Sequence, residues 1–146
     1  MNGLTEFLRK QKEAASPERA ERRRKEWLAA LDQLIQQIHS WLTDAEDEKL
    51  IKVRKSNITI SEETLGTYQA PSLTLTVGTK TVTLKPIGGV IIGADGRVDM
   101  QSAKGTYMFL YLADSKKWVH GFGERPSGFP ELTEKVFTDL LKRALA

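Results

Sequence analysis

The amino-acid sequence predicts an α+β fold: a long N-terminal amphipathic helix, an antiparallel β-meander of six or seven strands, and a C-terminal helix. Three observations predict it. Apolar residues recur at helical spacing over residues 27–42, they alternate with polar residues between about residue 50 and residue 122, and helical spacing returns after residue 130. The turns between the strands are too short for crossover helices, so the strands pair antiparallel.

The long helix is expected over residues 17–43, because Ser16 is a suitable N-cap and Pro17 suits the first helical turn. Its apolar stripe begins at Trp27, so residues 17–26 are expected to project as a solvated helical stem or to fray unless something binds them. A short amphipathic helix is expected at 4–15. We therefore divide the chain into a charged helical extension, residues 1–26, and a single α+β domain, residues 27–146.

In the meander, the apolar residues move from odd positions at Ile51 and Val53 to even positions at Ile58 and Ile60. This change predicts a bulge or a tight turn at Ser56-Asn57. A hairpin is expected around Gly78-Thr79. Further strands are expected at 90–93, 97–101, 106–112 and 117–122, with turns at 94–96 and 114–116, and the last helix at 130–145. The expected core includes Leu31, Leu34, Ile35, Ile38, Leu75, Val82, Leu84, Phe109, Val119, Val136, Phe137 and Leu140.

The stretch PIGGVIIGADGRVDM, residues 86–100, places four glycines within nine residues. A dinucleotide or phosphate loop would need a helix after the glycines, and here strands follow them. We therefore interpret Asp95-Gly96 as a hairpin turn that requires positive φ, and Gly88-Gly89 as a bend in the entering strand. No cofactor is expected.

Catalytic patterns are weak. Asp99 followed by Asp114-Ser115-Lys116 has the spacing of a metal-dependent nuclease, but the triplet falls where a turn is needed, so this remains a remote alternative. His39 and His120 are the two histidines, and neither has a nucleophile motif beside it. His120 is expected either to be buried or to line a shallow aromatic surface. We predict no catalytic residue, no metal ligand and no enzymatic activity.

The composition is that of an ordinary globular protein: 146 residues, 40% hydrophobic, net charge +3 and no cysteine. Without cysteine there is no disulfide or thiolate site, which fits a cytoplasmic protein. No apolar run has the length of a signal peptide or of a membrane span, so no membrane partner is expected.

Two segments are candidates for partner binding. The amino-terminal helix carries an apolar face, Leu4, Phe7 and Leu8, that must be buried on this domain or on another chain. The loop HGFGERPSGFP, residues 120–130, is interpreted either as a connection to the last helix or as a recognition loop that presents Phe122, Arg125 and Phe129.

The arginine-rich stem separates two functions. Residues 16–27 carry five basic and three acidic side chains, a balance that supports only modest binding to nucleic acid. The leading prediction is therefore a non-enzymatic protein-interaction module, such as an accessory, adaptor or immunity-like subunit, possibly self-associating. The alternative is a nucleic-acid-binding accessory protein that uses Arg22, Arg23 and Arg24.

Overall fold

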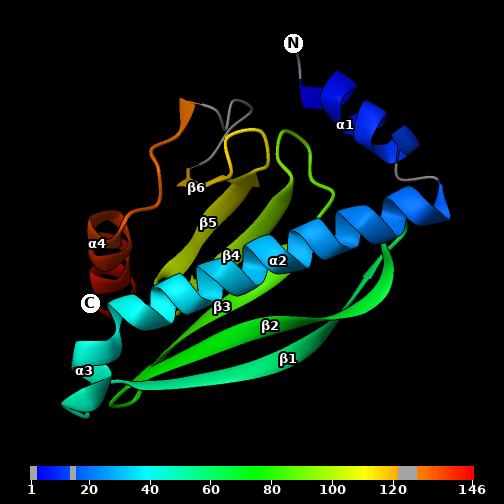
Figure 1. Cartoon of the computed structure of the whole chain (residues 1–146). Helices are drawn as coiled ribbons and strands as arrows, with labels where there is room; N and C mark the ends of the chain where they lie inside the picture. The colour runs from blue at the N-terminus through cyan, green and yellow to red at the C-terminus, as the bar shows by residue number, and fades with distance from the viewer. Residues whose placement is uncertain (1–2, 14–15, 122–127) are drawn as a thin grey trace.

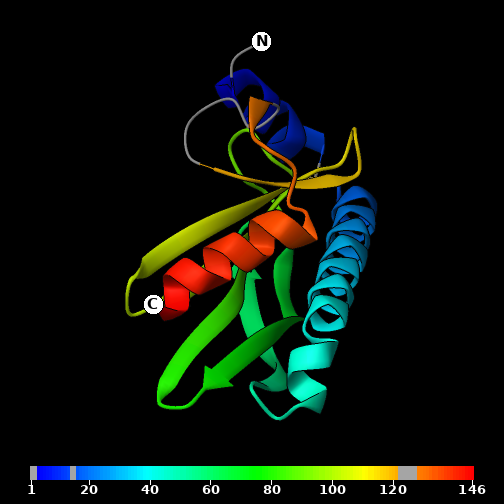
Figure 2. The same ribbon diagram turned by 90° about the vertical axis from the view of Figure 1, so that its left-hand side faces the viewer.

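A computed structural model describes residues 3–13, 16–121 and 128–146 of the chain. Six antiparallel strands form one sheet in the order β1-β2-β3-β4-β5-β6, and α2 and α4 cover one of its faces (Figures 1 and 2). The predicted α+β fold is confirmed. The elements are α1 (Gly3–Glu13), α2 (Pro17–Trp41), α3 (Thr43–Asp47), β1 (Lys52–Glu62), β2 (Gly66–Val77), β3 (Lys80–Gly88), β4 (Gly96–Ser102), β5 (Gly105–Leu112), β6 (Lys117–His120) and α4 (Glu134–Leu145).

Helix α2 begins as its sequence predicts. The Ser16 hydroxyl accepts a hydrogen bond from the Arg19 N–H at 3.4 Å, and Pro17 occupies the first turn. Helix α4 begins four residues later than predicted, at Glu134, because Thr133 and not a residue near Pro130 is its cap. Thr133 accepts a hydrogen bond from the Val136 N–H at 3.2 Å.

The residues before α4 extend the sheet instead of starting the helix. The His120 N–H donates to the Pro130 carbonyl at 3.1 Å, and the Leu132 N–H donates to the Trp118 carbonyl at 2.8 Å. Proline at 130 suits this position because its carbonyl, not its missing N–H, is what β6 requires. The sheet contacts of this short segment fix where α4 starts.

The predicted hairpins at Gly78-Thr79 and at residues 114–116 are confirmed. Gly78 has a φ of 60° and Lys116 a φ of 54° in the two turns. The predicted strand at 90–93 is wrong, since this segment forms only an isolated bridge between Ile91 and Ala94. The N–H groups of Gly89 and Val90, where that strand would begin, donate to a side chain instead.

No bulge or turn interrupts β1 at Ser56-Asn57, which corrects the sequence prediction. The register of β1 with β2 runs unbroken from Lys52 opposite Thr76 to Glu62 opposite Gly66. Strand β2 changes its buried positions as well, from Tyr68 and Ala70 to Leu73 and Leu75. Strand β3 pairs with β2 only over residues 73–77, so the rest of β1–β2 is a two-stranded ribbon, which twists more freely than a wide sheet. That twist turns the other face of the ribbon towards α2.

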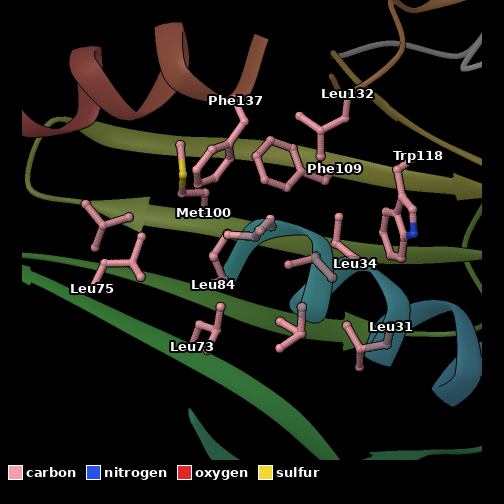
Figure 3. Packing of buried hydrophobic residues seen from close by; sticks show 14 of the residues in the cluster. Leu31, Leu34, Leu73, Leu75, Leu84, Met100, Phe109, Trp118, Leu132 and Phe137 are labelled. Atoms are coloured by element: carbon pink, nitrogen blue, oxygen red, sulfur yellow. The ribbon is translucent and has the colours of Figure 1, made fainter. Parts of the chain in front are cut away.

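The core lies between the sheet and both long helices (Figure 3). The rings of Trp41 from α2 and Phe137 from α4 lie 5.6 Å apart, so the two helices share one core. Of the twelve predicted core residues, Val136 alone is half-buried and the other eleven are buried. Val119 belongs to a second, smaller cluster, which also contains Ala94 and Leu110.

Candidate functional site

The glycine cluster of residues 88–96 is shaped by Trp27 of α2. A β-carbon on Gly96 would lie 2.2 Å from Trp27 Cζ3, and one on Gly89 would lie 2.7 Å from Trp27 Cγ. Gly96 is a strand residue in β4 without positive φ, whereas Gly93 has a φ of 83°. The interpretation of Asp95-Gly96 as a turn that needs positive φ is therefore wrong. These two glycines make room for the indole ring.

The carboxylate of Glu62 binds the backbone of the glycine cluster. It accepts hydrogen bonds from the N–H of Gly89 at 3.0 Å and of Val90 at 3.2 Å, and from the hydroxyl of Tyr68. The Trp27 indole N–H donates to the same Tyr68 hydroxyl at 3.0 Å. Burial, and then the neighbouring Glu62, raises the pKa of Tyr68. This network fixes the loop to the end of the β1–β2 ribbon.

A second network, which we name the Asp95 latch, joins α1, α2 and the 88–95 loop. Asp95 Oδ1 lies 2.6 Å from Lys10 Nζ and 3.3 Å from an Arg23 guanidinium nitrogen, and its Oδ2 accepts the Ala113 N–H at 2.7 Å. Burial raises the pKa of Asp95, but the contacts with Lys10, Ala113 and Arg23 outweigh burial and lower that pKa overall. Lys10 also donates to the Ala94 carbonyl at 3.2 Å.

The arginine-rich stem contacts loops of its own domain through two of its arginines. Arg23 donates to the Gly89 carbonyl at 3.2 Å, and Arg24 donates to the Leu65 carbonyl at 3.0 Å. Arg22 is exposed. Two of the three arginines named as candidates for nucleic-acid binding are therefore hydrogen-bonded to loops of the same chain.

Helix α1 lies over the 88–95 loop, beside the amino-terminal half of α2 (Figures 1 and 2). Lys10 joins the latch, Gln11 accepts a hydrogen bond from the Thr64 hydroxyl, and Gly3 lies against Ile92.

In the described part of the chain, the predicted apolar face of α1 is only partly covered. Leu4 is 56% exposed, Leu8 is 55% exposed, and Phe7 is half-buried. Ile92, which is 60% exposed, continues this apolar region next to Gly3. We name Leu4, Phe7, Leu8 and Ile92 the α1 surface. Sequence reasoning found its first three members but missed Ile92, because nothing in the pattern places residue 92 beside the amino-terminal helix.

Of the other candidate loop, residues 120–130, the structure describes only residues 120–121 and 128–130. Phe122 and Arg125 lie outside the described residues. Phe129 is half-buried and packs on the cluster of Ala94, Leu110 and Val119, with its ring over Gly121.

His39 and Asp99 form ordinary contacts with neighbouring side chains. His39 Nε2 lies 2.9 Å from Glu46, and Asp99 accepts two hydrogen bonds from Arg97 at 2.8 and 3.0 Å. His120 is half-buried, and burial, followed by the charge of Arg143, lowers its pKa. Over residues 3–13, 16–121 and 128–146, no three acidic or histidine side chains group as metal ligands would.

A groove of about 360 Å³ lies between α2 and the segment that leads into α4. Sequence reasoning did not find it, because its walls come from three separate parts of the chain. Its lining combines apolar side chains with charges of both signs and consists of Gln33, Leu34, Gln37, Trp41, Lys116, Lys117, Trp118, Glu131, Leu132, Thr133 and Glu134.

Comparison with known proteins finds no family model, no curated relative and no solved structure that matches this chain. Among the helices that the structure describes, none combines the length and the apolar character needed to cross a membrane.

Proposed function

We propose that this chain is a protein-interaction module that docks an apolar partner surface on the α1 surface. The observation that carries the proposal is the placement of α1, whose polar side chains Lys10 and Gln11 contact the domain while Leu4 and Leu8 stay more than half exposed. An amphipathic helix ordinarily buries its apolar stripe and leaves its polar face in water. Contiguous exposed apolar side chains, by contrast, are typical of interaction sites.

The distribution of exposed apolar side chains supports the same site. Four large hydrophobic side chains are strongly exposed in the described part of the chain, and Leu4, Leu8 and Ile92 are three of them. The fourth, Leu50, lies between α3 and β1, at the opposite end of α2 (Figure 1). Single exposed leucines are common on protein surfaces, whereas three in one place favour a docking role.

The contacts of the stem favour a protein partner over a nucleic acid. Binding to phosphates needs cationic side chains that are free to reach them. Arg23 and Arg24 donate to carbonyls of their own domain, and Lys10 is paired with Asp95. We place this module in the cytoplasm, with no cofactor and no catalysis of its own.

The proposal is tested with two variants matched in chemistry. Leu4→Ser combined with Leu8→Ser removes the exposed apolar side chains of α1, and Leu50→Ser removes one of similar exposure at the far end of α2. Each purified variant is used to recover proteins from extracts of the source cells, and a recovered partner is then purified and titrated against each variant.

We expect a partner whose affinity falls at least tenfold in the double variant and stays unchanged in Leu50→Ser. The proposal is wrong if no purified protein shows this dependence. It is also wrong if the wild type instead binds DNA or RNA with an affinity that falls steeply with salt and is lost in Arg22→Gln.

A further inference from the structure

Strand β1 forms a long free edge of the sheet. It comes first in the strand order, and on its other side no strand of the described residues pairs with it. Figure 1 shows β1 at the outer border of the sheet, with no ribbon beyond it. An edge of eleven residues presents a row of backbone N–H and C=O groups that a further strand can use.

Only half of this edge carries the charges that discourage strand pairing. Lys52, Arg54 and Lys55 stand in its first part, where repulsion and hydration oppose the approach of another strand. Residues 56–61, with the sequence SNITIS, hold no charge and no proline, and they are rich in β-branched side chains. The accessible part of the edge is therefore the half that ends near Glu62.

We propose that a second copy of this chain pairs with residues 56–62 of β1 in an antiparallel arrangement, with a two-fold axis at Thr59. The two sheets then become one sheet of twelve strands. This uses the β1 edge and not the α1 surface, so the inference is independent of the proposed function.

The sequence of the edge is self-complementary in this register. Beyond the paired residues, Lys55 of one copy lies beside Glu63 of the other, which is the first residue of the turn after β1, and this pair occurs twice because the interface is isologous. Both side chains are exposed, and neither forms an ion pair within the described part of the chain. Ile58 lies opposite Ile60, and Thr59 lies opposite its own copy. No like charges face each other between residues 55 and 63.

The burial pattern agrees with this pairing. Within residues 57–61 the odd positions Asn57, Thr59 and Ser61 are exposed, while Ile58 is half-buried and Ile60 is buried. The isoleucines of the two copies would therefore meet on the face of the sheet that already packs against the helices. Ile58 is half-buried, so its side chain has the most apolar surface left to bury against a neighbouring strand.

The first test measures the mass of the protein by sedimentation equilibrium over a wide range of concentration. We expect the wild type to dimerise. Lys55→Glu and Glu63→Lys alone each place two like-charged pairs in the interface and weaken the dimer by roughly tenfold. The variant that carries both changes exchanges the charges and restores the dimer. Thr59→Lys weakens it also, whereas Thr81→Lys, exposed on β3 away from the edge, does not.

A second measurement needs no variant. Hydrogen exchange followed against protein concentration is expected to show protection that grows with concentration in residues 55–63 and in no other strand. The inference is overturned if the wild type is monomeric throughout or if the charge exchange fails to restore the dimer. It is equally overturned if the dimer is lost in the Leu4→Ser, Leu8→Ser variant and kept in Thr59→Lys, because self-association would then belong to the α1 surface.

Discussion

Replacing Asp95 with asparagine tests whether the latch holds α1 and the 88–95 loop on the domain. In the wild type one carboxylate oxygen meets Lys10 and Arg23, and the other meets the Ala113 N–H. Whichever way the asparagine amide is turned, its NH₂ group faces a hydrogen-bond donor. The charges of Lys10 and Arg23 also lose their partner, and their side chains are only 12% and 19% exposed.

The expected loss of stability follows from this burial. Breaking a buried ion pair by removing one partner costs about 3–5 kcal/mol, and because this cluster is partly open to water we expect about 2–4 kcal/mol for Asp95→Asn. For a chain of this length that corresponds to a melting temperature lower by roughly 10 °C. The matched control is Asp139→Asn on α4, whose exposed pair with Lys135 contributes less than about 1 kcal/mol.

The dependence on pH distinguishes lost charge from lost packing. Because the pKa of Asp95 is lowered on folding, its contribution is present above the unfolded value of 3.8 and is lost as the pH falls through the lower folded value. Urea unfolding followed by tryptophan fluorescence should show a gap between wild type and variant at pH 7 that closes in strong acid. A variant as stable as Asp139→Asn at pH 7, or a gap that persists in acid, would refute the reasoning.

Two further predictions concern the packing around Trp27. Gly96→Ala brings a methyl group into contact with the indole and is expected to lower the free energy of unfolding, measured in urea, by about 1–3 kcal/mol. The control is Gly128→Ala, whose added carbon meets nothing within 4 Å and which should stay within about 0.5 kcal/mol of wild type. Equal losses in the two variants would contradict the close packing at Gly96. Tyr68→Phe leaves the Trp27 N–H and Glu62 without a shared hydroxyl and should cost about 1–3 kcal/mol. Since the pKa of Tyr68 is raised above its ordinary 10.0, this loss should be full below pH 10 and shrink in stronger alkali, and a loss unchanged there would argue against the network.

The fold could be predicted to the level of its elements because hydrophobic periodicity is a local property. The stripe from Trp27 to Leu42 and the alternation around Gly78 each report which face of an element is buried, and the core follows from those faces. The shift of the apolar residues from odd to even positions at Ser56-Asn57 is real, but it does not arise from a local bulge or turn. The shift follows from the twist of the two-stranded ribbon of β1 and β2, and the length of that ribbon depends on where β3 stops pairing with β2.

The contacts around the glycine cluster could not be predicted from the sequence. Gly96 resembles a turn glycine until Trp27, far away in the sequence, is placed beside it. Likewise the sequence indicates that Arg23 and Lys10 are solvated surface cations, whereas the structure pairs both of them with Asp95. Such side chains are recognised only when their partners are known, because the same residue types are typical of solvated helices. The apolar face of α1 was predictable, whereas its exposure was a property of the packed structure.

The central claim is that a protein partner covers the α1 surface, and photo-crosslinking in living cells tests it most directly. A photo-reactive phenylalanine analogue replaces Leu8 in one variant and Leu50 in another, since both side chains are strongly exposed. We predict that illumination gives one discrete adduct with a protein from position 8, that position 50 gives none, and that Leu4→Ser weakens the adduct. No discrete adduct at position 8, or the same adducts from both positions, would contradict the claim.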